Sequence, residues 1–308
     1  GRRRIEKPLM LTPLDFLTDL TNPQLTFLPK ALVVSMLAAL VCAVVGTHVV
    51  LRGMTFIGDA VAHAVFPGIA VAFVLQGSFL VGGIVAGVIT AILIAVFGNH
   101  HRLRSDAVIG VFFVAAFALG IVVMSRAPGY GGSLSSFLFG AITGIEDSAL
   151  VTSAVFTAIV LALLVILHRD LVVVGMDRGY AAALGLPVML LDIALSVLVT
   201  LAVVMSIHTI GNILVLALLV TPAASARMLT DRIVPMMACA AGIGMGSALL
   251  GVYFSWALDL PTGGTIVLVA TAIFVLSWAL SPRHGVLRNK RRGELDNGAE
   301  GTELEATV

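Results

Sequence analysis

Charged residues are scarce in this sequence. Asp, Glu, Lys and Arg make up only 11% of its 308 residues, against about 25% in a typical soluble domain. With 59% apolar residues and a mean hydropathy of +1.09, the composition excludes an ordinary soluble fold and predicts an integral membrane protein. The net charge of +1 gives no argument for a nucleic-acid partner.

Cysteine is scarce as well. Cys42 and Cys239 both fall inside apolar runs, which excludes a disulfide framework or a thiolate metal cage. Both are interpreted as small buried hydrophobic residues. A phosphate loop of the form G-x-x-x-x-G-K-[ST] is absent from the sequence, so the chain is predicted not to hydrolyse ATP itself and not to be an enzyme.

Apolar runs long enough to cross about 30 Å of hydrocarbon recur along the chain. The predicted spans are residues 31–51, 55–75, 79–97, 107–125, 148–167, 188–207, 210–229, 233–258 and 265–280. The expected fold is therefore all-α, a polytopic transmembrane bundle of about nine spans, with eight also possible. Residues 131–144 are too short to cross and predict a surface or re-entrant half-helix. The first run is full length and follows a polar lead, so we do not expect a cleaved signal peptide.

Basic residues gather in the loops at one end of the predicted bundle. These are Arg52, Arg102, Arg104, Arg169, Arg178, Arg227, Arg232, Arg283, Arg288, Lys290, Arg291 and Arg292. The loops at the other end hold only Arg126, so the basic end is predicted to face the cytoplasm. An odd span count places the N-terminus outside, although that segment is itself basic. Either the segment is an exception or the count is wrong by one.

The chain is divided into three parts on this basis. Residues 1–30 form an N-terminal polar or interfacial segment, and residues 31–281 form the transmembrane domain. Residues 282–308 are polar, acidic and rich in glycine, and predict a disordered cytoplasmic tail.

Asp59 and His63 are an ionisable pair inside the predicted span 55–75, which otherwise has no charged group. A charged side chain in hydrocarbon costs several kcal/mol, so such a pair in mid-span is by default a functional-site hypothesis. The i, i+4 spacing places both side chains on one helix face. A carboxylate beside an imidazole suits manganese, iron or zinc better than copper(I). The pair therefore predicts a path for a divalent cation, and the alternative is a hydrogen bond that locks two helices together.

The surroundings of the pair support more than a stray polar contact. Ala60, Ala64 and Gly68 form a stripe of small residues, which lets transmembrane helices approach closely. Pro67 cannot donate the hydrogen bond that the His63 carbonyl would normally accept. One Asp and one His are too few ligands for a transition metal, so the site predicts a homodimer with its pathway on the two-fold axis. Pro222 is expected to kink its span at a moving part.

Residues 168–187 interrupt the pattern of spans. Asp177 is a plausible N-cap, Gly185 is a natural C-terminal stop, and Pro187 prevents continuation of the helix. The segment therefore predicts a two-turn helix on the cytoplasmic surface, either a plain connector or an element that seats in another protein's groove.

Four blocks of sequence carry a resemblance to a known family. They are residues 50–68 (VLRGMTFIGDAVAHAVFPG), 177–185, 211–227 (GNILVLALLVTPAASAR) and 260–264 (LPTGG). These blocks resemble the permease subunits of bacterial ATP-binding-cassette importers for manganese, zinc and iron, and the resemblance covers residues 31–280.

The resemblance implies a set of partners. In that family two permeases pair in the membrane, two ATPase subunits dock beneath them, and an external binding protein delivers the metal. By resemblance, Asp59 and His63 belong to the metal path. The residues implied for coupling to the ATPase are Asp177, Arg178, Tyr180, Ala181, Ala182 and Gly185. His48 departs from the family pattern, in which an apolar residue is usual, and no metal role is assigned to it.

Other polar and small residues give weaker signals. Asp192, His208 and Asn212 are interpreted as caps or interhelical hydrogen bonds rather than ligands. A loop at the outer end is predicted either to contact the binding protein or to form a plain turn; its residues are Asp259, Pro261 and Thr262. Glycines at small-xxx-small spacing predict helix packing; they are Gly83, Gly87, Gly242 and Gly246.

The expected function is import of a divalent metal by alternating access, in a multi-pass protein of the bacterial cytoplasmic membrane. Manganese is favoured, with iron and zinc as alternatives, and no cofactor is expected to be bound permanently. The expected partners are a second copy of the chain or a paralogous permease, ABC ATPase subunits, an extracellular metal-binding lipoprotein and the lipid bilayer. Two other classes stay open. One is a secondary transporter driven by an ion gradient, with Asp59 and His63 as a proton relay, and the other is a membrane scaffold that transports nothing.

Overall fold

The computed structural model describes residues 12–22, 25, 27–54, 56–98, 105–125, 147–210 and 212–281. Within these residues the regular elements are all helices, which confirms the all-α class. They are α1 (Pro13–Leu20), α2 (Phe27–Leu51), α3 (Ile57–Val74), α4 (Phe79–Gly98), α5 (Ser105–Ser125), α7 (Asp147–Met176), α8 (Arg178–Ala183), α9 (Val188–Ile210), α10 (Asn212–Leu229), α11 (Ile233–Leu258) and α12 (Thr262–Leu280). The half-helix expected at 131–144 and the tail expected at 282–308 lie outside the described residues.

The predicted spans each correspond to a helix. Seven helices of the described part are long and apolar enough to cross a membrane, and α5 and α10 carry shorter apolar stretches, Ala107–Val123 and Leu214–Leu229. The largest difference is at the end of α7, which was expected near residue 167 but continues to Met176. Leu171 and Val174 are buried, so this extra part of α7 has an apolar face to pack, and helix replaces the first half of the predicted connector.

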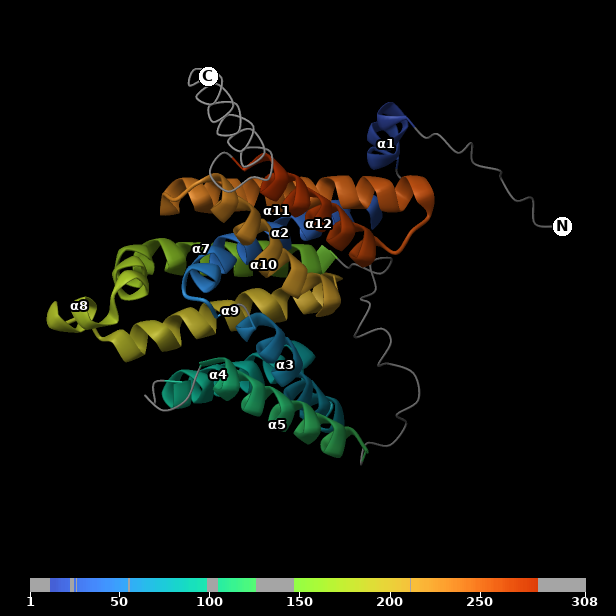
Figure 1. Cartoon of the computed structure of the whole chain (residues 1–308). Helices are drawn as coiled ribbons and strands as arrows, with labels where there is room; N and C mark the ends of the chain where they lie inside the picture. Colours follow the sequence, from blue (N-terminus) through green and yellow to red (C-terminus); the bar gives the residue numbers. More distant parts are fainter. Residues whose placement is uncertain are drawn as a thin grey trace, which may run out of the picture.

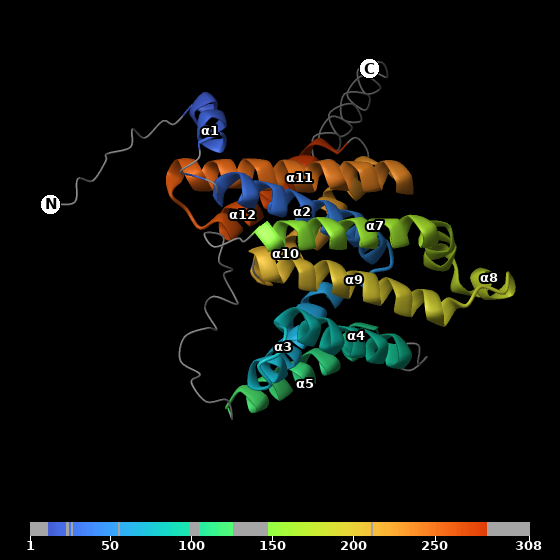
Figure 2. The same ribbon diagram turned by 180° about the vertical axis from the view of Figure 1, so that it is seen from behind.

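The helices are arranged around α2. In Figures 1 and 2, α3, α4 and α5 lie together on one side, α11 and α12 lie on the other, and α7, α9 and α10 lie between them. Helix α2 packs against α7, α9, α10 and α11, and its residues 41–49 are all buried. Cys42 is buried in this stretch as predicted, but Cys239 on α11 is exposed, so the prediction of burial is wrong for Cys239.

Several helices approach each other at glycine. A Cβ atom at Gly46 of α2 would collide with the main-chain carbonyl of Leu219 on α10, and Gly68 of α3 and Gly82 of α4 each sit against the other's carbonyl. Gly68, the last residue of the small-residue stripe on α3, therefore packs against α4 of the same chain.

Of the two glycine pairs predicted to pack against other helices, one does so within the described chain and the other does not. A Cβ at Gly83 would lie 2.9 Å from Val65, and one at Gly87 would lie 2.6 Å from a Thr200 methyl group, so both are packing positions. Among the described residues, no heavy atom lies within 4 Å of a Cβ built at Gly242 or Gly246. The packing predicted for that second pair is therefore not made within this chain.

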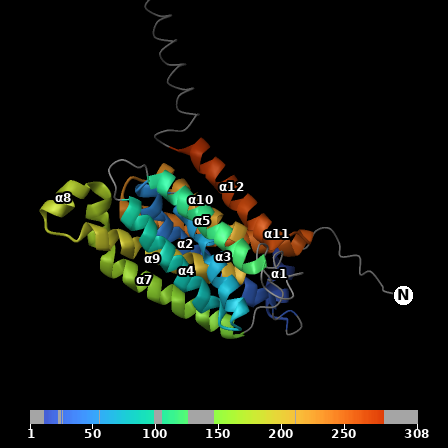
Figure 3. The ribbon, with the colours of Figure 1, turned by 90° about the horizontal axis from the view of Figure 1, so that it is seen from below.

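The two ends of the bundle differ in charge. Arg52, Arg178, Arg227 and Arg232 lie at the end where α2 and α10 finish and where α3, α9 and α11 begin, and we call this the arginine-rich end. Helix α8 protrudes there, beyond the ends of α7 and α9 (Figures 1 and 3).

Helix α1 lies at the opposite end of the bundle (Figure 1). Its Phe16 is buried against Tyr253 and Trp256 near the end of α11, with ring centroids 5.3 Å from each. The described N-terminal helix therefore lies on the side that an odd span count predicts. Residues 1–11, which carry the basic cluster at the N-terminus, are outside the described part.

Candidate functional site

Asp59 and His63 lie on one face of α3, close enough to act on one ligand. His63 Nε2 is 3.5 Å from Asp59 Oδ1, and the side chains are 26% and 40% exposed, respectively. Metal–ligand bonds of about 2.0 to 2.2 Å place two ligand atoms of one ion about 3 to 4 Å apart. The observed separation is in this range, and both groups are exposed enough to reach an ion outside the chain.

The pair lies at the start of α3 but beside the middle of a neighbouring helix. Asp59 is in the first turn of α3, whereas the His63 ring lies against Phe113 and Phe117, near the middle of α5. Helix α3 begins at Ile57 directly after a tight turn. In that turn Gly53 has a φ of 68°, and the Met54 N–H donates to the Val49 carbonyl. A carboxylate in the first turn of a helix also interacts favourably with the helix dipole.

The His63 ring is held by two aromatic side chains of α5. Its centroid is 5.0 Å from that of Phe113 and 5.4 Å from that of Phe117, both in edge-to-face geometry. Neither ring offers a conventional hydrogen-bond partner, so they orient the imidazole while its nitrogens stay available to Asp59 and to an ion. Sequence reasoning missed both residues because two Phe residues at i, i+4 are ordinary in an apolar helix.

A single chain does not form a complete metal site within the described residues. No group of three or more His, Cys, Asp or Glu side chains that could hold an ion occurs there. Pro67 is buried inside α3, one turn after His63, and its nitrogen carries no proton for the His63 carbonyl. Asp59, His63 and that carbonyl are thus the groups that the chain offers here.

Helix α8 forms from local sequence signals, as predicted. The Tyr180 N–H donates to Asp177 Oδ1 at 2.9 Å, which caps the helix start. Gly185 adopts a φ of 77°, and the N–H of the following Leu186 donates to the Ala181 carbonyl. Ala181 is buried, whereas Tyr180 and Ala182 are exposed. The helix therefore presents a face that nothing in this chain covers among the described residues.

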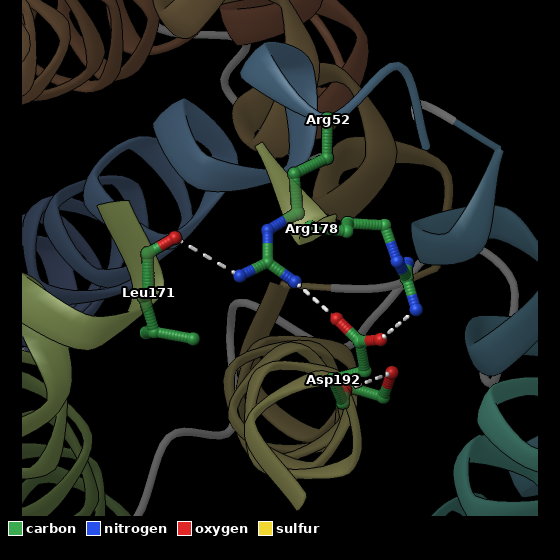
Figure 4. Close-up of polar contacts among 5 residues, drawn as sticks. Arg52, Leu171, Arg178 and Asp192 are labelled. Atoms are coloured by element: carbon green, nitrogen blue, oxygen red, sulfur yellow. Dashed lines mark hydrogen bonds and ion pairs between the residues drawn. The ribbon is translucent and has the colours of Figure 1, made fainter. Parts of the chain in front are cut away.

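An ion-pair cluster connects α8 to two other elements (Figure 4). Arg52 Nη1 donates to Asp192 Oδ1 at 2.7 Å, and Arg178 Nη2 donates to Asp192 Oδ2 at 2.6 Å. Arg52 Nη2 also donates to the Leu171 carbonyl of α7 at 3.1 Å. Burial lowers the pKa of the Arg52 guanidinium, and the Asp192 carboxylate acts in the opposite direction. Asp192 thus makes the interhelical contact predicted for it, with partners that the sequence did not reveal.

The remaining candidates include Pro222 and the loop between α11 and α12. Pro222 is buried inside α10. Asp259 ends α11 with a φ of 55°, and Pro261 precedes α12. The Thr262 hydroxyl lies 2.6 Å from that of Ser255, which donates to the Leu260 carbonyl.

These contacts make residues 259–262 a tight turn at the end opposite the arginine-rich end.

The His48 ring is buried against that of His168, with centroids 5.5 Å apart. The side chains of His208 and Asn212 lie outside the part that the structure describes.

The family model described as "ABC 3 transport family" matches residues 24–281. The chain is similar to the manganese transport system membrane protein MntC of Halalkalibacterium halodurans, with 38% identity over 87% of this chain and 92% of that protein. It is also similar to the chelated iron transport system membrane protein YfeC of Yersinia pestis, with 34% identity over 87% of this chain and 91% of that protein.

The fold is similar to that of a solved structure, PsaBC from Streptococcus pneumoniae in complex with Fab. The TM-score is 0.80 at 32% sequence identity, and the match covers 91% of this chain and 100% of that one. The family model and the similar fold both extend over nearly the whole described chain.

Proposed function

The chain belongs to the ABC 3 transport family, and from this membership we propose that it is the permease through which an ATP-driven importer carries manganese into a bacterial cell. The resemblance to metal-importer permeases is confirmed. The chain is a multi-pass protein of the cytoplasmic membrane and a transport subunit, not an enzyme. ATP hydrolysis belongs to a separate partner.

The observation that carries the proposal is the geometry of Asp59 and His63. The pair offers oxygen and nitrogen without sulfur, 3.5 Å apart on a half-exposed helix face. Manganese accepts oxygen-rich shells of higher coordination number, whereas protein zinc sites are usually four-coordinate. Similar proteins are named for manganese and for chelated iron, which supports manganese first and iron second. Intrinsic affinity favours zinc over manganese, so the proposed preference for manganese must rest on the geometry of the site and on the metal that the binding protein delivers.

A second copy of the chain completes the site in this proposal. Two chains related by a two-fold axis bring two Asp59 carboxylates and two His63 imidazoles to one ion, and two negative charges neutralise one divalent cation. The His63 carbonyls left free by Pro67 provide further oxygen. A paralogous permease with the same pair satisfies the same requirement, so the chemistry supports a dimeric pathway and favours the simpler homodimer.

Helix α8 is the proposed docking element for the ATPase. It protrudes at the arginine-rich end (Figure 3), which the distribution of basic residues predicts to be cytoplasmic. The turn at residues 259–262 lies at the opposite end, and we propose that it faces the external metal-binding lipoprotein. Its internal hydrogen bonds give it a fixed shape for such a contact.

The metal is tested by the cellular content of a strain that lacks this chain. Manganese is expected to fall several-fold at low external supply, with zinc unchanged, and added manganese is expected to restore growth. Elemental analysis of washed cells measures both metals, and the strain complemented with the wild-type gene is the control. A loss of zinc alone, with growth restored by zinc, would show that manganese is the wrong ion.

Coupling is tested at Ala182, which is exposed on α8. A carboxylate at this position would be buried against the ATPase without a partner, and such burial is costly. Ala182→Glu is therefore expected to release the ATPase or to separate ATP hydrolysis from metal uptake. Copurification and binding-protein-stimulated hydrolysis are the measurements.

Ala182→Ser is the matched control, because it stays small and uncharged. If Ala182→Glu behaves like Ala182→Ser in both assays, α8 is only a connector. Uptake that persists without any ATPase and follows an ion gradient would instead support a secondary transporter.

A further inference from the structure

Asp192 lies where three elements of the chain meet. One of its carboxylate oxygens accepts from Arg52, in the turn between α2 and α3, and the other accepts from Arg178, the first residue of α8. Asp192 itself belongs to the start of α9. Arg52 also reaches the end of α7 through the Leu171 carbonyl. Figure 4 shows both guanidinium groups pointing toward the same carboxylate.

The turn that holds Arg52 leads directly into α3. The Arg52 N–H donates to the His48 carbonyl and the Ile57 N–H donates to the Met54 carbonyl, so main-chain bonds run from the end of α2 to the start of α3. Asp59 follows in the first turn of α3. A displacement of Arg52 would therefore pass along a short, hydrogen-bonded segment to the Asp59 carboxylate.

Burial makes the two ion pairs unequal. The Arg52 and Asp192 side chains are 8% and 14% exposed, whereas the Arg178 side chain is 54% exposed. Removing one member of a buried pair leaves an uncompensated charge, which is strongly unfavourable. An exposed pair is screened by water and easily broken. The Arg52–Asp192 ion pair is therefore expected to persist when α8 moves, and the Arg178–Asp192 ion pair is the one expected to break.

There is room for such a movement beside the cluster. A cavity of about 40 Å³ is lined by Arg178, Asp192 and Ser196 and by apolar residues that include Met54 and Ile57, and this volume is enough for a few water molecules. Helix α3 also packs against α9, and Ile57 and Leu195 belong to the same buried cluster. The ion pairs therefore act beside an apolar contact between the two helices.

We infer that Asp192 is a positioning residue for coupling, which links the position of α8 to the position of the turn before α3 and so to Asp59. The inference rests on the proposed docking of the ATPase at α8. In this arrangement the ATPase moves α8, the Arg178 contact changes, and the Arg52–Asp192 pair carries the change to the helix that holds the metal ligands.

The test uses the complete importer, with manganese uptake and ATP hydrolysis measured per assembled complex. Asp192→Asn keeps the shape of the side chain but removes its charge, and it is expected to reduce uptake about tenfold or more while hydrolysis stays within about twofold, as expected for coupling between sites. Arg178→Ala is expected to reduce uptake about three- to tenfold, and the double variant to be no worse than Asp192→Asn, because both act through one link. Asp192→Glu restores a carboxylate and is expected to recover most of the uptake.

The matched control is Asp231→Asn, which removes a separate ion pair with Arg227 at 3.8 Å and is expected to keep wild-type uptake. Wild-type and Asp59→Ala complexes are measured alongside, because uptake that depends on Asp59 supports the proposed function whatever the Asp192 variants do. If uptake and hydrolysis fall in parallel in the Asp192 and Arg178 variants, or if neither falls, the inference is wrong. Should Asp192→Asn fail to assemble, Arg178→Ala decides the matter, because its side chain is mostly exposed.

Discussion

Asp59→Ala and His63→Ala are each expected to abolish manganese uptake while the chain still assembles with its ATPase. Replacement of a residue that merely supports a metal ligand costs about 10- to 100-fold in metal affinity, so loss of a ligand should reduce uptake by more than about a hundredfold. Both side chains are partly exposed, and their loss leaves little empty space in the core. Uptake of radioactive manganese and copurification with the ATPase are the measurements.

Two further variants separate charge from shape at this site. Asp59→Asn keeps the volume of the carboxylate and removes its charge, and it is expected to be as inactive as Asp59→Ala. Asp231→Ala, at an exposed position of the arginine-rich end, is expected to transport normally. Near wild-type uptake by both Asp59→Ala and His63→Ala would contradict the assignment of the pathway, and the pair would then be a structural contact between helices.

Gly46→Leu is expected to prevent accumulation of folded protein. A Cβ atom at this position would collide with the Leu219 carbonyl, and main-chain atoms cannot turn aside as a flexible side chain can. Overpacking of a core typically costs about 1 to 3 kcal/mol and occasionally more, and here two central helices, α2 and α10, would have to separate. The amount of membrane-inserted protein and its thermal stability in detergent are the measurements.

Gly264→Leu is the control for that experiment. Gly264 lies on α12, and a Cβ built there meets no heavy atom within 4 Å among the described residues. The same substitution in another membrane helix is therefore expected to leave the amount of folded protein within about twofold of wild type, as is usual for surface changes. Equal losses for both variants would mean that leucine is harmful in general and that the contact with Leu219 is not the cause.

The sequence predicted those features that depend on neighbouring residues. The spans were found because the length of an apolar run is a direct property of the chain. The start and stop of α8 were found because Asp177 and Gly185 act on their own helix. The predicted end of α7 near residue 167 is wrong because charged Arg169 suggests a loop, whereas Leu171 and Val174 beyond it are buried in the bundle.

Features that depend on tertiary packing were not visible in the sequence. Arg52 and Asp192 are 140 positions apart, and no periodicity connects them. The two Phe rings beside His63 come from another helix for the same reason. Glycine spacing alone does not predict which glycines pack against another helix. A Cβ at Gly83 or Gly87 would contact a neighbouring helix, whereas one at Gly242 or Gly246 would contact nothing in the described chain.

The position of Asp59 and His63 ahead of the apolar part of α3 has a consequence for leakage. From Ala64 to Val74, helix α3 has no charged side chain, and at 1.5 Å per residue this stretch is about 16 Å long. An apolar lining of that length excludes water and bare ions when it is closed. Ions that have reached the pair would then be separated from the opposite side by a dry seal, which would keep the importer from dissipating the membrane potential between cycles.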